Sequence, residues 1–398
     1  MRSMNIVAMV GVLLMFAGQA LGTTYTSVQS NKEWASNLTW GTPLATDYPQ
    51  LAEDNANVYH VIKYLRATGA SCGTAYVYPG GEIWNAGTGS PFATVKTYME
   101  GGGINVSVGV WAMSGRSMYV DVNSYVTRGT ATGGGGLGSG TAGYSMAMHG
   151  SADLTLMAIG AFYADATSDF SGTYIVQPGP NNIKTYLYTA GCLTGNYRIE
   201  SGGDIHMQLG ADVTYLHTLS GWGALTVGQY KKVTFGSGAI VRPGEANAPD
   251  AAVLSLGLPA FDTPKFDFGA GSTVMIDVTS DTTYDQLVLG FTYAGTTTIL
   301  ADALLQVNLF TPVVETTLSN LVIWNSTTIG ITGMYALGNI SYTNDTGWDS
   351  LSVVKSADSK QLLLSGHYSS VIPEPGTLLL VGTGLLGGLG YLRRRRIN

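Results

Sequence analysis

Short segments of alternating polar and apolar residues, each introduced by glycines, recur through the middle of the chain. They include residues 101–108, 201–209 and 269–278. In the first of them Ile104, Val106 and Val108 fall two residues apart, which is the period of a β-strand with one buried face. Glycine supplies the positive φ angles that tight turns require. The pattern therefore predicts an all-β protein made of short strands and tight turns.

The distance between the glycine turns indicates how such strands are arranged. Gly81 and Gly103 lie about one coil of a β-solenoid apart, and the longer gaps between Gly203, Gly238 and Gly271 leave room for inserted loops. Because a single coil cannot bury its apolar face alone, the coils must stack. We expect a right-handed parallel β-helix, or solenoid, for the body of the chain. A β-sandwich carries the same local signals and is the alternative.

Composition narrows the classes of partner. Charged residues account for only 11% of the chain, against roughly 25% in ordinary globular proteins, and the formal net charge is −7. The body has no basic patch, so nucleic acid is not expected as a partner. The two cysteines, Cys72 and Cys192, are expected as isolated buried thiols, although an extracellular setting would permit a disulfide.

The C-terminal end has three segments in a fixed order. Pro373, Glu374 and Pro375 come first, an apolar run over residues 377–392 follows, and Arg393, Arg394, Arg395 and Arg396 come last. As a helix the run would be about 24 Å long at 1.5 Å per residue, slightly short for a bilayer core of roughly 30 Å. The arginines should stay in the cytoplasm and leave the rest of the chain outside. We expect a C-terminal transmembrane helix that acts as a temporary anchor, with an ordinary single-span anchor as the alternative.

In this order the tail, residues 371–398, resembles a PEP-CTERM sorting signal. The resemblance implies that exosortase, a membrane transpeptidase, reads the box of Pro373, Glu374 and Pro375 and removes the helix and the arginine cluster. The partners implied are therefore an exosortase and, transiently, the inner membrane. The resemblance predicts where the protein is located and predicts no activity.

The N-terminus predicts export as well. Arg2 gives a basic start, residues 6–17 form an apolar run, and Ala20, Leu21 and Gly22 form a small-x-small cleavage signal. The run is too short to span a bilayer, so residues 1–22 are expected to be a cleavable signal peptide. The body, residues 23–370, should then function outside the cytoplasm.

A second resemblance concerns the fold of the body. Residues 236–368 contain a series of strand-like segments at 240–244, 272–278, 285–289, 305–309 and 329–335. They resemble the closing coils of autotransporter-like parallel β-helices, and the segment from Trp34 to Trp40 is similar to the first coil of such proteins. Residues 23–70 are therefore expected to form an N-terminal cap and first coil. The less regular segment between leaves the number of coils open.

Residues 50–66 depart from the strand pattern. Their apolar residues lie near helical spacing, and Asp54 could serve as an N-cap. This segment is expected to form either a helix or, equally, a polar loop followed by a strand from Val58. Residues 129–143 are rich in glycine, serine and threonine and are expected to form a flexible surface loop.

Two pairs of carboxylates are weak catalytic leads. Glu200 and Asp204 flank one glycine turn with Arg198 nearby, and Asp165 and Asp169 form the other pair. Glycoside hydrolases need two carboxylates roughly 5–10 Å apart, and polysaccharide lyases need a bound Ca²⁺ or a base. We expect solvated turn residues instead, and hence no enzyme, no cofactor and no metal site.

Other motif matches are expected to be fortuitous. Residues 69–73 match a nucleophile-elbow pattern and residues 133–143 match a dinucleotide fingerprint by letter, but no helix is predicted after either. Alternation points His206 outward, and its spacing from His217 fits no standard metal motif. Twenty-three tyrosines and seven tryptophans could either stack on sugar rings or fill the core.

These observations together predict an exported bacterial cell-surface or extracellular-matrix protein with a structural or adhesive role, with exopolysaccharide as a candidate partner. The alternative is an extracellular carbohydrate-active enzyme, a polysaccharide lyase or hydrolase, on the same parallel β-helix.

Overall fold

The computed structural model describes most of the chain between residues 23 and 369. The segments left out of this range are 30–31, 35–39, 42–48, 50–53, 65–70, 86–92, 107–109, 112–115, 129–134, 138–144, 158, 180–183, 229–230, 246–250, 258–264, 291–295, 301, 311–315 and 327–330. The predicted signal peptide and the predicted transmembrane helix both lie outside the described residues. Within the described residues no helix is long and apolar enough to cross a membrane.

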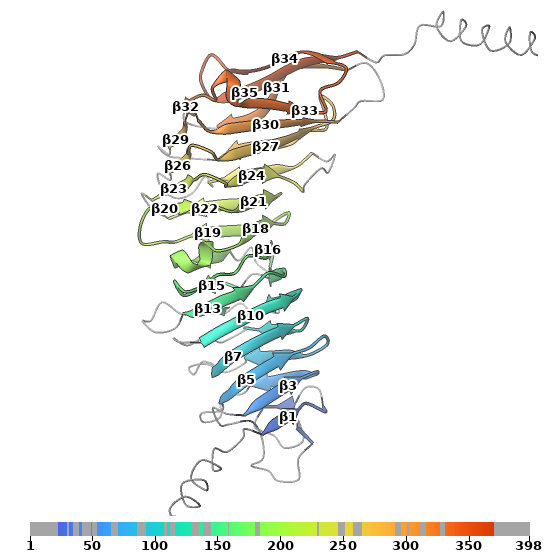
Figure 1. The fold of residues 1–398 in the computed structure, drawn as a ribbon, viewed down its shortest axis with the longest axis vertical. Coiled ribbons are helices and arrows are strands. Elements are labelled where there is room, and N and C mark those ends of the chain that lie inside the picture. Colours follow the sequence, from blue (N-terminus) through green and yellow to red (C-terminus); the bar gives the residue numbers. More distant parts are fainter. Residues whose placement is uncertain are drawn as a thin grey trace, which may run out of the picture.

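The described residues form a parallel β-helix, a single stack of coils along one axis (Figure 1). One sheet, which we call the long sheet, has 13 strands and receives one strand from each coil. Its strands are β2 (Lys32–Glu33), β4 (Val61–Tyr64), β6 (Glu82–Asn85), β8 (Gly103–Asn105), β11 (Ser124–Thr127), β14 (Leu154–Met157), β16 (Thr173–Gln177), β18 (Asn196–Ile199), β21 (Thr218–Gly221), β24 (Ile240–Pro243), β27 (Thr273–Val278), β30 (Leu304–Leu309) and β33 (Ile340–Thr343). The all-β, parallel β-helix prediction is confirmed.

Two further sheets are formed by the strands that come just before the long-sheet strand of their coil. One lies in the N-terminal half of the stack and the other in the C-terminal half. The N-terminal sheet contains β1 (Thr24–Thr26), β3 (Asn55–Val58), β5 (Ser71–Val77), β7 (Ala93–Glu100), β10 (Arg116–Val122) and β13 (Met146–Gly150). The C-terminal sheet contains β20 (Val213–Tyr215), β23 (Lys232–Phe235), β26 (Lys265–Phe268), β29 (Thr296–Ile299) and β32 (Ile331–Gly333). Between them the chain forms the short 3₁₀ helix η2 (Ala190–Leu193).

The remaining face is the side sheet, which also closes the stack. Its strands are β9 (Val110–Trp111), β12 (Gly136–Leu137), β15 (Ala161–Phe162), β17 (Thr185–Leu187), β19 (Asp204–Met207), β22 (Ala224–Val227), β25 (Val253–Leu256), β28 (Gln286–Leu289), β31 (Thr316–Ser326), β35 (Gln361–Tyr368) and β34 (Trp348–Lys355). The last three strands pair antiparallel, and a second 3₁₀ helix, η3 (Leu337–Asn339), precedes β33. This antiparallel cap covers the C-terminal edge of the side sheet.

The alternation seen in the sequence accounts for the core. Ile205 and Met207 of β19 are buried, whereas Asp204 and His206, which alternate with them, are half-buried. The glycines next to these strands are required where coils approach closely. A Cβ atom on Gly103 would lie 2.1 Å from the ring of Tyr125 on the next strand, closer than any real contact, so a larger residue would displace that ring.

The core changes character along the stack. In the N-terminal half it is mainly aliphatic. From the middle of the stack onward, buried rings follow one another through the interior and form what we call the inner column: Phe162, Tyr174, Tyr197, Tyr215, Phe235, Phe268, Trp324 and Tyr335. Neighbouring centroids in this column lie between 4.8 and 6.4 Å apart, the range of favourable aromatic pairs.

One buried polar group is compensated within the long sheet. Asp277 of β27 is almost fully buried and accepts hydrogen bonds from Arg242 of β24 and Asn308 of β30, at 3.4 and 2.6 Å. The three residues come from consecutive coils. A buried carboxylate is tolerated only when it is paired in this way, so this row fixes the register of three strands.

Of the two alternatives for residues 50–66, the helix is wrong, because the described part of that segment forms the strands β3 and β4. Asp54 is buried and accepts a hydrogen bond from the backbone N–H of Thr23 at 3.2 Å. The loop expected over residues 129–143 contains the buried strand β12. Cys72 and Cys192 are both free and buried, as expected.

Candidate functional site

The most regular surface feature is a row of stacked rings on the outer face of the N-terminal sheet. Tyr76, Tyr98, Tyr119 and His149 stand on β5, β7, β10 and β13 at directly paired register positions. We call this row the tyrosine ladder. Its successive ring centroids lie 4.9, 4.7 and 4.8 Å apart, and the ring planes differ by 10° to 23°. The ladder exists because each coil places an outward ring at the same position.

The stacking determines what the ladder can offer to a ligand. The ring planes differ by only 10° to 23° and the centroids lie less than 5 Å apart, so neighbouring rings of the ladder lie face to face. Tyr98 and Tyr119, in the middle of the ladder, therefore have both ring faces covered by their neighbours and expose only the ring edge and the hydroxyl group. A sugar ring stacks on an open aromatic face, so the ladder serves contacts between coils better than it serves sugar stacking.

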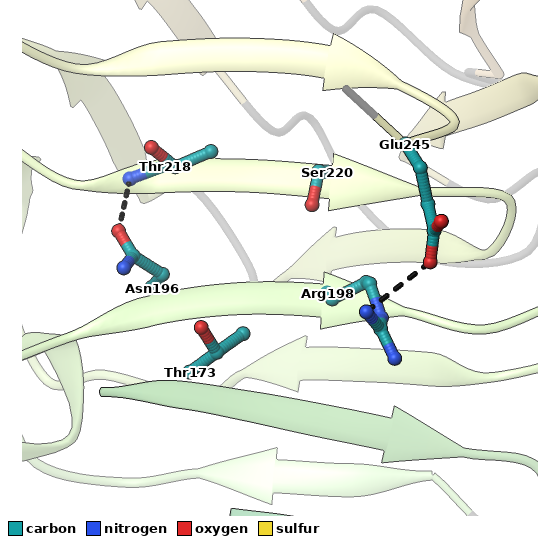
Figure 2. Close-up of a pocket in the computed structure, with 6 residues that line it drawn as sticks. All are labelled: Thr173, Asn196, Arg198, Thr218, Ser220 and Glu245. Atoms are coloured by element: carbon teal, nitrogen blue, oxygen red, sulfur yellow. Dashed lines mark hydrogen bonds and ion pairs between the residues drawn. The ribbon is translucent and has the colours of Figure 1, made fainter. Parts of the chain in front are cut away.

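The candidate site itself is a shallow polar groove on the outer face of the long sheet. It has a volume of about 370 Å³ and is lined by Thr173, Asn196, Arg198, Thr218, Ser220 and Glu245. Figure 2 shows these side chains arranged in rows across three neighbouring strands, with Glu245 at one end. All the lining residues are polar or charged, so the groove is built for hydrogen bonding.

Strand register explains how the groove forms. Thr173 of β16 pairs with Asn196 of β18, and Arg198 of β18 pairs with Ser220 of β21. Outward residues of adjacent strands stand about 4.8 Å apart and those along one strand about 6.8 Å apart. The groove is therefore a regular grid of polar side chains on three consecutive coils, and in the next coil Thr218 pairs with the apolar Ile240 of β24.

Arg198 organises the charges of the groove. Its Nε atom donates to Glu200 Oε1 at 2.9 Å, and its Nη1 atom lies 3.2 Å from Glu245 Oε1 (Figure 2). One guanidinium thus faces two carboxylates, and these three residues together carry a net charge of about −1 at neutral pH. The guanidinium is already engaged, and the carboxylates already have a cation between them.

The hydroxyl and amide groups of the groove are left available. Asn196 Oδ1 accepts a hydrogen bond from the backbone N–H of Thr218 at 3.0 Å, which orients its amide nitrogen away from that strand. The hydroxyl groups of Thr173 and Thr218 make no side-chain hydrogen bond with any residue that the structure describes. Ser220 Oγ has only a long contact, 3.5 Å, to the carbonyl of Tyr197. The hydrogen-bond donors and acceptors of the groove therefore lie close together and remain available to a ligand.

The other carboxylates predicted from the sequence have separate local partners. Asp204 lies 2.9 Å from Lys184 Nζ on the side sheet; burial raises the pKa of Asp204, and Lys184 opposes that rise. Asp169 lies 2.5 Å from His149 at the end of the tyrosine ladder. Asp165 accepts hydrogen bonds from Thr167, chiefly from its backbone N–H, and these lower the pKa of Asp165. Of the predicted leads, the structure brings Arg198 and Glu200 into contact.

The histidines and the motif matches have structural surroundings. His206 points outward, as expected, and its Nδ1 lies 2.8 Å from Thr226 Oγ1 on the next coil. His217 packs against the edge of Tyr215. No group of three or more histidine, cysteine or acidic residues that could hold a metal occurs among the described residues. Ser71 begins strand β5 rather than a helix, which removes the context of a nucleophile elbow.

Apart from Arg198, sequence reasoning did not find the residues that define these two surfaces. Thr173, Asn196 and Glu245 come into one groove only through the register of strands separated by loops of different length. The ladder had a weak signal, since Tyr76, Tyr98 and Tyr119 follow one another at about the length of one coil. That signal could have been recognised against the high tyrosine content only with the strand register in hand.

Comparison with known proteins identifies the tail. A family profile described as the PEP-CTERM protein-sorting motif matches residues 371–396. The chain ends in a PEP-CTERM sorting motif. The motif implies an exported protein that passes through the membrane to the cell surface and is processed by an exosortase, a membrane transpeptidase. The predicted box of Pro373, Glu374 and Pro375 and the arginine cluster Arg393–Arg396 fall within this match, and they lie outside the described residues. No curated protein matches the chain.

Proposed function

We propose that this PEP-CTERM protein is a cell-surface or extracellular-matrix component with a structural and adhesive role, and that it has no enzymatic activity. The observation that carries the proposal is the continuous stack of coils that ends in an antiparallel cap directly before the sorting motif. The last strand, β35, ends at Tyr368, and the motif begins at residue 371.

The position of the tail sets the geometry of attachment. Any anchor at the C-terminal end holds the capped end of the stack and leaves the N-terminal coils furthest away. At about 4.8 Å per coil, the long sheet of 13 strands extends over roughly 60 Å. A rigid body of this length suits a spacer that presents its sides to a surrounding matrix, for which an exopolysaccharide layer is the proposed setting.

The partners of the candidate catalytic groups support a non-enzymatic role. Arg198 is held between Glu200 and Glu245, and Asp204 is held by Lys184. A hydrolase needs two carboxylates that face one substrate bond, one of them as the general acid. Each of these carboxylates instead faces a cation that lies within two coils of it.

One observation favours a second candidate, an extracellular polysaccharide lyase or hydrolase. Burial raises the pKa of Asp204, and its Oδ1 atom is buried without a hydrogen-bond partner. A carboxyl group that holds its proton to higher pH is the usual form of a general acid. Depolymerisation of a polysaccharide by the protein, lost on Asp204→Asn, would favour this candidate over ours.

The sorting part of the proposal is tested by replacing the box. We expect the native protein outside the cell to yield no peptide beyond Pro375 by mass spectrometry. The triple change Pro373→Ala, Glu374→Ala and Pro375→Ala should leave the chain in the membrane fraction with its arginine end intact. Pro178→Ala, at an exposed position of the body, is the matched control and should behave as the native chain does.

Two results would overturn the proposal. One is native protein recovered outside the cell with Arg393–Arg396 still attached. The other is full-length chain dissolved in the cytosol with both termini uncut.

A further inference from the structure

We propose that the polar groove on the long sheet binds a linear, neutral polysaccharide that lies parallel to the axis of the stack. The inference deepens the proposed adhesive role and rests on it, because it names the ligand class and the face of the protein that would hold the ligand.

The charges of the groove exclude ionic ligands. An anionic ligand would need a free cation, but Arg198 is already engaged by Glu200 at 2.9 Å and by Glu245 at 3.2 Å. The net negative charge of this group repels a further anion. A metal cation would have to compete with the guanidinium for both carboxylates, and it would lie next to a fixed positive charge. A ligand without charge meets neither obstacle.

The hydrogen-bonding groups of the groove match hydroxyl groups. A sugar hydroxyl both donates and accepts a hydrogen bond, so its site needs donors and acceptors at close spacing. Asn196 supplies an amide donor whose orientation is fixed by its bond to the Thr218 backbone. Thr173, Thr218 and Ser220 supply hydroxyl groups, and Glu245 supplies a carboxylate acceptor at the edge. The lining has no apolar side chain, so an apolar ligand would gain little from entering.

The direction of the ligand follows from the strand register. Thr173, Asn196 and Thr218 stand on consecutive strands of the long sheet, which repeat about every 4.8 Å along the axis. Figure 2 shows the three side chains following one another across the strands, with Ser220 and Arg198 in a parallel row. A linear polymer laid along the axis therefore meets one polar side chain on each of these three coils, whereas a polymer laid along a strand would cross only two of the rows.

The test measures binding by the full-length protein, purified in detergent, in native gels that contain a soluble polysaccharide. Pullulan and galactomannan serve as neutral probes, and alginate serves as the anionic counterpart. The double variant Thr173→Val and Ser220→Ala removes two hydroxyl groups at nearly constant volume. The matched control, Thr234→Val and Ser255→Ala, makes the same changes at half-buried strand positions of two other sheets, outside the groove.

We expect retardation of the native protein by at least one neutral polymer and none by alginate. The groove variant should bind that polymer at least tenfold more weakly, and the control variant should bind as the native protein does. Binding to no neutral polymer, equal binding by the groove variant, or a preference for alginate would each overturn the inference. A failure here leaves the processing of the tail unaffected, since that is measured separately by mass spectrometry of secreted protein.

Discussion

The tyrosine ladder should stabilise the N-terminal coils through contacts between neighbouring rings. Tyr98 is its central tyrosine and stacks on Tyr76 at 4.9 Å and on Tyr119 at 4.7 Å. A stacked pair contributes about 0.5–1.5 kcal/mol beyond the burial of area. The change Tyr98→Leu keeps an apolar side chain but removes both stacked pairs. It should therefore lower the free energy of unfolding of these coils by about 1–3 kcal/mol.

A double-mutant cycle separates stacking from general packing. Tyr76→Leu and Tyr98→Leu, singly and together, should give a coupling energy of about 0.5–1.5 kcal/mol. Tyr76→Leu combined with Tyr188→Leu is the matched control, because Tyr188 stacks on Tyr163 beside the side sheet and shares no ring with the ladder. That control should be additive.

The appropriate assay is local. In a solenoid each coil contacts only its neighbours, so the effect should be read from amide hydrogen exchange of peptides that cover β7, with β30 as an internal reference. Exchange should accelerate in β7 and stay unchanged in β30. A coupling energy indistinguishable from that of the control cycle would refute the idea that ring stacking, rather than apolar burial, joins these coils.

Two further predictions concern single positions. Gly221 has a φ of 114°, and a Cβ atom there would lie 2.1 Å from the carbonyl oxygen of Ile199. Gly221→Ala should therefore destabilise its coil by about 1–3 kcal/mol. The control Gly210→Ala has open space around the added atom and should change the stability measured by hydrogen exchange by much less. Burial lowers the pKa of His217 below its usual 6.5, so the folded protein binds this proton less readily than the unfolded chain. Stability relative to His217→Gln should then be constant above pH 6.5 and fall as the pH drops below it, and a difference that stays flat from pH 8 to pH 5 in urea unfolding would contradict this assignment.

The strands could be predicted from the sequence because their signal is local. Alternation in β19 and β27 buries Ile205, Met207, Val274 and Ile276, as the apolar period of two requires. The same local character explains the wrong helix over residues 50–66. Ala56 and Val58 are buried in β3 and Ile62 in β4, and this spacing fits a strand, a turn and a strand as well as it fits one face of a helix.

The number of coils and the groove could not be predicted because both depend on register. Loops of unequal length separate successive strands of the long sheet, so residue spacing does not reveal which outward side chains become neighbours. Arg198 and Glu200 were recognised as close because one strand carries both. Glu245 follows β24, two coils further along, and only the stacked structure brings it to the same guanidinium.

The aromatic rings move from the outside of the stack to the inside where the N-terminal sheet ends. The ladder stops at His149 on β13, the last strand of that sheet, and the inner column starts at Phe162 of the same coil. Loss of a ladder ring removes a surface contact, whereas loss of an inner ring such as Tyr197 leaves a void that costs about 3–5 kcal/mol for a large aromatic side chain.

The two halves therefore tolerate change differently. In the N-terminal half the stacking rings lie on the surface above an aliphatic core, so outward residues can vary while the coil stays filled. In the C-terminal half the rings form a column inside a core that also holds aliphatic residues such as Leu254 and Leu305, and the outer face of the long sheet carries polar side chains. The polar groove lies on that face, where β16 and β18 carry the buried Tyr174 and Tyr197 on their inner side, so the surface proposed to bind a ligand lies directly over the inner column.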